Sequence, residues 1–321
     1  MVHLGVIGLG NIFEKQKEVL DKMKDRYCLE GIFDFNQEKR NRWGTLNFYS
    51  DVKELFEDKN VEVVLISTPP KTHFEIAEKC LQNGKHVILE KPATVTMSQL
   101  TNLHNLAKKQ GCMLYVAYHA GFAKDLLWFL DNWKMLEKKY AFGKLKEIHC
   151  QFFDPYMQEG RLLPQAVNLC GSYLDSGVNA LSVCDKIMEF TDGRLSGHEE
   201  KRMDKEDYCT TFESVSVYEN DGCRMILETG FSRGINYKET ELFFENTQDS
   251  VVLCHSKQSV YLKKSGKEMI LLYENLDTER LTAQYEGVFE EFYHLWTQKG
   301  SNTARTFRIH RLLFSPGDEN S

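Results

Sequence analysis

Two stretches carry polar side chains where the surrounding residues predict burial. KHVILEKP places the amine of Lys91 directly after a strand-like apolar run, and CGSYLDSGVNAL (residues 170–181) places Asp175 and Asn179 four residues apart, on one face of a helix. An amine, a carboxylate and an amide together are suited to proton transfer and to holding hydroxyl groups. Each also has an ordinary alternative: a solvated lysine after a strand, a helix cap at Asp175 and a buried, satisfied amide at Asn179.

A glycine-rich turn near the N-terminus predicts a nucleotide site. In GVIGLGNIF, Gly8 and Gly10 follow a strand-like run and open a helix-like one, with Phe13 where a third glycine would complete G-x-G-x-x-G. Such a turn lets the backbone approach a pyrophosphate at the positive end of a helix. Asp34 ends the next strand-like run, where a carboxylate accepts hydrogen bonds from ribose hydroxyls and repels a 2′-phosphate. We therefore expect NAD, with NADP as the alternative because two arginines lie nearby; the other interpretation of Asp34 is a turn residue.

The elements that position these groups follow two patterns. The first 120 residues alternate strand-like and amphipathic helix-like runs, which predicts a doubly wound parallel sheet. Later, period-two alternation and the turn at Asp221-Gly222 predict an antiparallel sheet, followed by a long helix in TERLTAQYEGVFEEFYHLWTQKG. We expect an α/β fold: an N-terminal dinucleotide-binding Rossmann domain at 1–121, a C-terminal α/β domain with a large, open, mostly antiparallel sheet at 122–315, and a flexible tail at 316–321.

Composition limits the classes of partner. The chain has 321 residues, 42% hydrophobic and 27% charged, with a formal net charge of -7 and scattered basic residues, which argues against nucleic acid or an anionic membrane as partner. It has no apolar run long enough to span a membrane and no signal-peptide pattern, so we expect a cytoplasmic protein. Nine cysteines without a C-x-x-C pair predict free thiols and no metal site.

Three segments resemble the glucose–fructose oxidoreductase and inositol dehydrogenase family (Gfo/Idh/MocA). They are GLGNIF, TPPKTHFEIAEKCLQNGKHVILEKP and GSYLDSGVNAL, so the resemblance covers nearly the whole chain. The middle segment is specific, because a T-P-x-x-x-H loop, an amphipathic helix and E-K-P follow in order. The resemblance implies a nicotinamide-binding domain followed by an α/β domain with a large open sheet. The expected cofactor-binding residues are Gly8, Gly10, Asn11, Ile12, Asp34, Thr68, Pro69, His73, Glu90 and Lys91.

The resemblance also implies catalytic roles. Lys91 takes the place of the lysine beside the nicotinamide, and Asp175 that of the aspartate in a G-G-x-x-x-D-x-G-x-H motif, while Asn179 occupies the histidine position and Cys170 that of the first glycine. Since an amide cannot titrate, either catalysis has been lost or another group accepts the proton. L-D-x-G-x-N-A-L is similar to the aldose 1-dehydrogenase branch, where asparagine holds this position. A hemiacetal hydroxyl is more acidic than an ordinary alcohol, so a desolvated Lys91 would suffice as base.

We therefore expect an NAD(P)-dependent oxidoreductase acting on a small sugar or polyol, with oxidation of an aldose at C1 to a lactone as the best hypothesis. The alternatives are an inositol-type polyol dehydrogenase, a carbonyl reductase of the same fold, and a non-catalytic NAD-binding regulator. The uncovered face of the second sheet predicts a homodimer or homotetramer. The expected substrate-binding residues are His119, Asp154, Tyr156 and Arg161.

Overall fold

The computed structural model describes residues 1–36, 38–44, 46–189, 191–205, 208–266 and 268–314, which form two compact units. The first contains Met1–Tyr118 and Tyr285–Phe307, and the second contains His119–Gln284 and the chain from Arg308. The sequence-based domain limits at 121 and 315 stay a prediction; they do not include the return of residues 285–307 to the first unit. The predicted tail, 316–321, lies outside the described residues. None of the helices within these ranges is long and apolar enough to cross a membrane.

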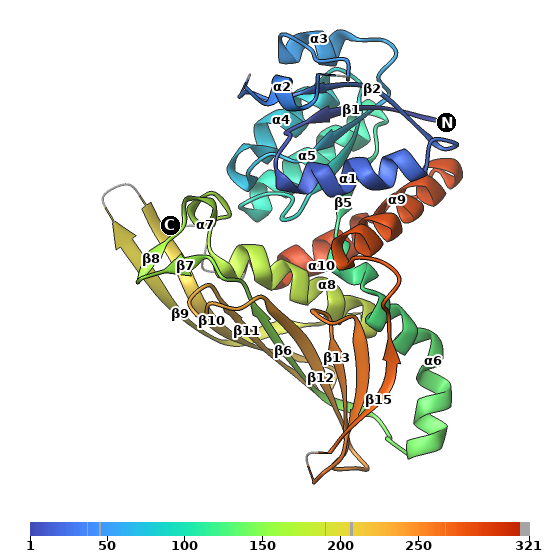
Figure 1. Cartoon of the computed structure of the whole chain (residues 1–321), viewed down its shortest axis with the longest axis vertical. Coiled ribbons are helices and arrows are strands. Elements are labelled where there is room, and N and C mark those ends of the chain that lie inside the picture. Colours follow the sequence, from blue (N-terminus) through green and yellow to red (C-terminus); the bar gives the residue numbers. More distant parts are fainter. Residues whose placement is uncertain (37, 45, 190, 206–207, 267, 315–321) are drawn as a thin grey trace. The chain divides into compact units, whose positions relative to one another are not determined.

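The first unit is built on a parallel sheet of five strands in the order β2-β1-β3-β4-β5 (Figure 1). All four residues of β3, VVLI, are buried, as expected for a parallel strand covered on both faces. The predicted doubly wound parallel sheet is thereby confirmed. The strands are β1 (Val2–Ile7), β2 (Tyr27–Phe33), β3 (Val63–Ile66), β4 (His86–Glu90) and β5 (Leu114–Ala117). The helices are α1 (Asn11–Lys22), α2 (Lys39–Arg42), α3 (Val52–Glu57), α4 (Pro70–Gln82), α5 (Met97–Gln110) and, from Tyr285 onward, α9 (Arg280–Gln298).

The second unit is built on an eight-stranded sheet in the order β15-β14-β13-β12-β6-β11-β10-β9. Every neighbouring pair is antiparallel except β6 and β11, which run parallel. The predicted turn at Asp221-Gly222 joins β10 to β11, and both residues have positive φ, as a two-residue hairpin requires. The strands are β6 (Leu145–Phe153), β9 (Arg194–Lys205), β10 (Tyr208–Asn220), β11 (Cys223–Gly230), β12 (Tyr237–Phe244), β13 (Ser250–Cys254), β14 (Ser259–Lys263) and β15 (Met269–Glu274). The shorter strands β7 (Met157–Gln158) and β8 (Arg161–Leu162) form a separate pair.

One face of this sheet is covered by helices. Helix α8 (Val178–Ile187) packs against β6, and α6 (Lys124–Tyr140) packs against β13, β14 and β15. Along β6 the buried residues Ile148, Cys150 and Phe152 alternate with the half-buried Glu147 and His149. The second face is therefore polar along this central strand. Two further helices complete the unit, α7 (Pro164–Asn168) and the C-terminal part of α10 (Thr303–Leu313).

A bidentate ion pair fixes the end of α10 to α8. Arg308 donates from Nε and Nη2 to the two carboxylate oxygens of Asp185, at 2.8 and 2.9 Å. The Asp185 side chain is only 2% exposed and that of Arg308 is 16% exposed, so the carboxylate has little access to water. Loss of the guanidinium would remove two charge-assisted hydrogen bonds from a buried carboxylate.

We expect Arg308→Ala to lower the free energy of unfolding by about 3–5 kcal/mol, the range for breaking a buried ion pair from one side. Denaturant-induced unfolding of the full chain followed by circular dichroism measures the loss. Arg311→Ala, at an exposed position of the same helix, is the matched control and should change stability by less than about 0.5 kcal/mol. Equal effects of the two substitutions would contradict a special role for the Asp185 pair.

Candidate active site

The turn between β1 and α1 has the geometry of a nucleotide-binding loop. Gly8 has a φ of 98°, and a Cβ there would lie 2.6–2.8 Å from backbone atoms of Ser67 and Thr68, so only glycine fits. Gly10 precedes the first turn of α1, and a Cβ there would meet nothing within 4 Å. This open space beside the N–H groups of a helix N-terminus fits a pyrophosphate. Phe13, in place of a third motif glycine, is fully buried and packs edge-on against Trp43.

Asp34 lies at the end of β2 and ties two loops together. Its carboxylate accepts hydrogen bonds from the backbone N–H of Leu9, at 2.7 Å, and of Asn36, at 2.8 Å. Lys39 lies 3.4 Å from the same carboxylate and donates to the carbonyl of Leu9. The carboxylate oxygens have further lone pairs, which leaves them able to accept hydrogen bonds from a ribose. That predicted role of Asp34 stays a prediction.

The lysine at this edge was not foreseen. Lys39 is beside Asp34, whereas the sequence had suggested the arginines that follow it. Arg42 instead forms an ion pair with Glu14, and the side chain of Arg40 lies outside what the structure describes. An ammonium group at the end of β2 is the feature of this site that would tolerate a 2′-phosphate.

His73 joins the loops that follow β3 and β4. Its ring is fully buried, with Nδ1 2.8 Å from the carbonyl oxygen of Pro92 and Nε2 2.8 Å from that of Thr68. Burial lowers the pKa of His73, because the charged imidazolium is poorly solvated there. His73 therefore holds the shape of the loops.

Glu90 is also bound within the first unit. Its Oε1 accepts from Nε2 of Gln16 at 2.8 Å and from the hydroxyl of Tyr285 at 2.7 Å. Burial raises the pKa of Glu90, and the hydrogen bond from Tyr285 opposes that shift. These hydrogen bonds fix the end of β4 and therefore the position of the backbone from which the side chain of Lys91 extends.

The remaining cofactor candidates lie at the same edge of the sheet. Asn11 and Ile12 open α1, Thr68 and Pro69 lie between β3 and α4, and the half-buried Lys91 follows β4. Since these strands are parallel, their carboxyl ends meet at one edge, where ligands bind in such sheets. Lys91 belongs to the first unit, whereas the other predicted catalytic residues, Asp175 and Asn179, belong to the second.

In the second unit, a π-helical turn carries the catalytic candidates. It spans Tyr173–Gly177 and continues directly into α8, so the predicted regular helix starts with a wider turn. Asp175 and Asn179 are both buried, and Nδ2 of Asn179 donates to the backbone carbonyl of Asp175 at 3.2 Å. Oδ1 of Asn179 is buried and has no hydrogen-bond partner among the described residues. Such an acceptor is costly in the protein alone and is available to a ligand.

Residues before the turn account for the departure from the family motif. Cys170 has a φ of 62°, a conformation that glycine adopts without strain and cysteine does not. Gly171 has a φ of 92°, and a Cβ there would lie 2.8 Å from the carbonyl oxygen of Thr211. The second motif glycine is thus required by close packing, while the first position accepts a strained side chain.

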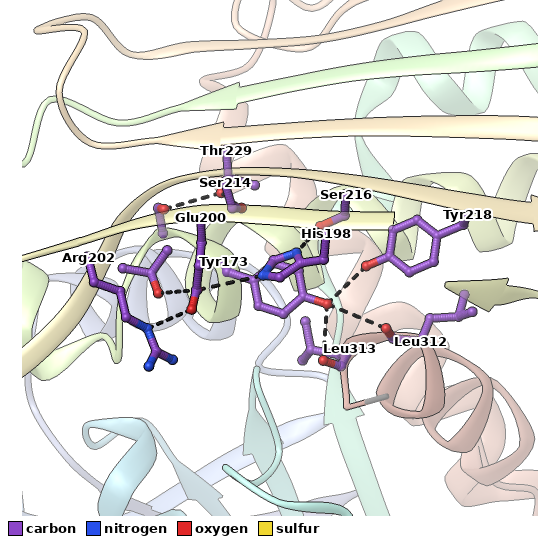
Figure 2. A network of polar contacts seen from close by, with 12 residues as sticks. Tyr173, His198, Glu200, Arg202, Ser214, Ser216, Tyr218, Thr229, Leu312 and Leu313 are labelled. Atoms are coloured by element: carbon purple, nitrogen blue, oxygen red, sulfur yellow. Dashed lines mark hydrogen bonds and ion pairs between the residues drawn. The ribbon is translucent and has the colours of Figure 1, made fainter. Parts of the chain in front are cut away.

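A polar network anchors the π-helical turn to the sheet (Figure 2). The hydroxyl of Tyr173 lies 3.0 Å from that of Tyr218 and donates to the carbonyl of Leu313 at 3.1 Å. The ring of His198 packs against Tyr173, with 4.7 Å between ring centroids, and its Nδ1 lies 2.8 Å from Oγ of Ser216. Strands β9 and β10 and the end of α10 therefore hold the segment that carries Asp175.

Asp154, a predicted substrate ligand, also holds that segment. Its Oδ2 accepts from Oγ of Ser176, within the π-helical turn, at 3.1 Å. Its Oδ1 accepts from Nζ of Lys238 at 2.6 Å and from Nδ2 of Asn236 at 3.2 Å. Burial lowers the pKa of Lys238, and the charge of Asp154 opposes this shift. The described contacts of Asp154 are thus to protein groups that position the turn.

A narrow cavity of about 10 Å³ lies at the centre of these groups, enough for roughly one water molecule. Lys238, Arg280 and His255 line it together with Asn179. Within the described residues of the second unit, Arg280 forms no hydrogen bond and no ion pair. Burial lowers the pKa of Arg280, and the nearby charge of Asp154 opposes that shift. The guanidinium of Arg280 and Oδ1 of Asn179, which have no hydrogen-bond partner among the described residues of this unit, therefore line the same cavity.

Sequence analysis did not identify three of these residues. Lys238 could have been found, because it lies on the same face of β12 as the buried Thr240 and Leu242. Arg280 and His255 gave no signal beyond their residue type. His255 lies 2.6 Å from Asp125, but the two groups are not aligned for a hydrogen bond, and its Nε2 instead contacts Oγ1 of Thr240.

The other predicted substrate ligands differ in position. His119 lines the cavity, and its Nδ1 lies 2.9 Å from Oε1 of Gln284. Tyr156 is half-buried. Burial raises the pKa of Tyr156, and the nearby negative charges of Asp154 and Asp175 raise it further. Arg161 is exposed on β8 and is not among the residues around the cavity, so the structure does not bring it to the other candidates.

Comparison with known proteins agrees with this architecture. Residues 2–118 match a family model described as oxidoreductase family, NAD-binding Rossmann fold. An uncharacterized oxidoreductase of Escherichia coli, YdgJ, is 42% identical over 144 residues, 40% of this chain and 42% of that protein. Myo-inositol 2-dehydrogenase of Thermotoga maritima is 30% identical over 152 residues, 46% of this chain and 43% of that protein. The matched regions thus span less than half of these relatives.

A solved structure extends the similarity of fold to the second unit. It is a 3-ketoreductase from Actinomadura kijaniata in complex with TDP-benzene and NADP, with a TM-score of 0.81 at 17% identity. The alignment covers 97% of this chain and 95% of that one. The predicted fold class, a Rossmann domain followed by an α/β domain with a large, mostly antiparallel sheet, is therefore confirmed.

The geometry at Gly10 generates a prediction about cofactor binding. Gly10→Ala should leave the melting temperature within about 4 °C of the wild type, because the Cβ meets nothing and the extended backbone accepts alanine. It should weaken NADH binding at least about tenfold, because the methyl group occupies the space of the pyrophosphate. Fluorescence titration with NADH measures this. Unchanged affinity would argue against a pyrophosphate at Gly10, and Gly8→Ala serves as a comparison that should lose stability as well.

Proposed function

Residues 2–118 of this chain belong to the Gfo/Idh/MocA family of NAD-binding oxidoreductases, and we propose that the protein is an NAD(P)-dependent dehydrogenase acting on a sugar or polyol. The observation that carries this proposal is the polar lining of the second unit. There Asn179 offers a buried oxygen without a partner, beside a guanidinium that forms no ion pair among the described residues. A single ligand hydroxyl, for which the cavity has room, would satisfy both, since a hydroxyl donates one hydrogen bond and accepts others.

We propose that the amine of Lys91 is the base that accepts the proton of the substrate hydroxyl. In the oxidative direction a nicotinamide held at the Gly8–Gly10 loop would supply the acceptor for the hydride of the substrate carbon. The O–H bond of the hydroxyl group on that carbon also breaks. Its proton goes to the amine of Lys91 and then to solvent, and a carbonyl forms. Asp175 accepts a hydrogen bond from a substrate hydroxyl, and Asn179 donates to and accepts from others. Half-burial of Lys91 at the carboxyl end of β4 supports this role.

The proposed substrate is an aldose oxidised at C1 to a lactone. Asn179 supports it, because an amide in place of a titratable histidine suits a reaction whose hydroxyl is already acidic. The second candidate is an inositol-type polyol. It is supported by the 30% sequence identity, over 152 residues, between this chain and a protein named myo-inositol 2-dehydrogenase. NADH formation with matched aldoses and cyclitols distinguishes the two, and NADPH formation in parallel tests the proposed preference for NAD.

The proposed partner is a second copy of the chain. The face of the eight-stranded sheet opposite α6 and α8 exposes Val215, 41% accessible, among polar groups such as the His149–Glu228 pair. A homodimer or homotetramer through this face would cover the valine while the polar pairs lie across the interface. Sedimentation of the full chain tests it, and a monomer at micromolar concentration would contradict it.

Lys91→Met should reduce kcat/KM for the best aldose by about 100-fold to 10,000-fold, the range for loss of a general base. NADH affinity should stay within about threefold, because the backbone that holds the cofactor is unchanged. Lys79→Met, at an exposed position of α4, is the control and should leave both quantities unchanged. If Lys91→Met retains turnover while NADH binds, the amine is not the base.

Asn179→Leu separates a ligand contact from a structural one. The substitution removes a buried acceptor without a partner and one hydrogen bond of 3.2 Å, so stability should change by no more than about 1 kcal/mol. Turnover should fall at least about tenfold in kcat/KM if a substrate hydroxyl uses Oδ1. Asn220→Leu removes the other such asparagine oxygen among the described residues, on β10 and away from the cavity, and should leave turnover unchanged. Large loss of stability with full turnover would reverse the interpretation.

A further inference from the structure

A cluster of three potential metal ligands lies on the first two strands of the chain. His3 of β1 and Cys28 and Glu30 of β2 each place one ligand atom within 4.8 Å of the other two. Among the described residues no other group of three His, Cys, Asp or Glu side chains is this close. All three residues belong to the first unit.

The pairing of the strands explains why the three side chains converge. His3 is directly opposite Cys28 in the parallel ladder, so their side chains are neighbours. The register then shifts between Leu4 and Gly5: Leu4 pairs with Leu29 and Gly5 with Gly31, so Glu30 has no partner on β1. This is a β-bulge, a feature that redirects a side chain and is frequent beside functional sites. The bulge therefore adds Glu30 to the pair formed by His3 and Cys28.

The charges around the cluster favour a cation. Nδ1 of His3 lies 2.6 Å from Oε1 of Glu30, and the thiol of Cys28 donates to the same carboxylate. That hydrogen bond raises the pKa of Cys28, and the contact with His3 lowers the pKa of Glu30. Asp58 adds negative potential at Glu30, and a carboxylate oxygen of Glu62 lies 3.4 Å from the backbone nitrogen of His3.

We infer that His3, Cys28 and Glu30 form a binding site for a divalent transition metal, best matched by Zn²⁺. Imidazole nitrogen, thiolate sulfur and carboxylate oxygen are the three donor types that Zn²⁺ accepts, whereas a thiolate selects against Mg²⁺ and Ca²⁺. Ligand atoms in a tetrahedral zinc site are about 3.3–3.8 Å apart, so His3 and Glu30 would separate by roughly 1 Å. The side chains of His3 and Glu30 are 41% and 23% exposed, which permits that adjustment and leaves a fourth position for water.

The site is distinct from the nucleotide half-site. His3 is five residues before Gly8 along β1, about 16 Å in an extended strand, so the two lie at opposite edges of the sheet. A metal there takes no part in hydride transfer. It joins the N-terminal strand to its neighbour and stabilises the edge of the sheet that carries the chain start. This inference does not depend on the proposed dehydrogenase activity.

Isothermal titration of the full-length protein with Zn²⁺ tests the site. We expect one equivalent to bind with a Kd of micromolar or tighter, and Co²⁺ in its place to show a thiolate-to-cobalt charge-transfer band. Cys28→Ser should abolish that band and weaken Zn²⁺ binding at least about 100-fold, and His3→Gln should weaken it at least about tenfold.

Cys209→Ser provides the matched control, since Cys209 is an exposed thiol of the second unit. It should bind Zn²⁺ as the wild type does. Circular dichroism of each variant shows whether it is folded before titration. The inference is overturned if the wild type binds no Zn²⁺, or if folded Cys28→Ser retains wild-type affinity while Cys209→Ser loses it.

Discussion

The nucleotide half-site depends on the direct contact between two backbones, that of Gly8 after β1 and that of Ser67–Thr68 after β3. No side chain can enter this contact, because even a Cβ would lie 2.6 Å from a backbone carbon. The contact brings the ends of the two central strands together and leaves open space at Gly10, two residues later. The loop from Gly8 to Gly10 and the loop that leads to His73 are therefore both shaped by the absence of a side chain at Gly8.

In the second unit a single buried carboxylate has a comparable role. Asp154 contacts the π-helical turn through Ser176 and strand β12 through Lys238 and Asn236. Since Lys238 is thereby paired, Arg280 is the cation of the cavity that is left for a ligand. The electrostatics of this cavity thus depend on which buried charges are paired: Lys238 is bound to Asp154, whereas Arg280 forms no ion pair among the described residues of its unit.

The sequence was sufficient for the parts of the fold that depend on local patterns. Continuous apolar runs such as VVLI identified the parallel strands, and Asp221-Gly222 identified a hairpin. Residues whose role depends on long-range packing could not be predicted in this way. Arg280 reaches the cavity only because the start of α9 is next to α8 in the folded unit, and its position has no motif. Arg161 is exposed on β8, in the separate β7–β8 pair, and its predicted contact with substrate stays a prediction.

The two short contacts of His73 have a consequence for the loops it joins. Both ring nitrogens face carbonyl oxygens at 2.8 Å, but a neutral imidazole carries only one N–H. Since burial keeps the ring neutral, either the loop after β3 or the loop after β4 is hydrogen-bonded, and the other faces a lone pair. Exchange of the proton between Nδ1 and Nε2 would therefore release one loop as it secures the other, so that the tautomer of His73 sets how freely the loop after Lys91 adjusts.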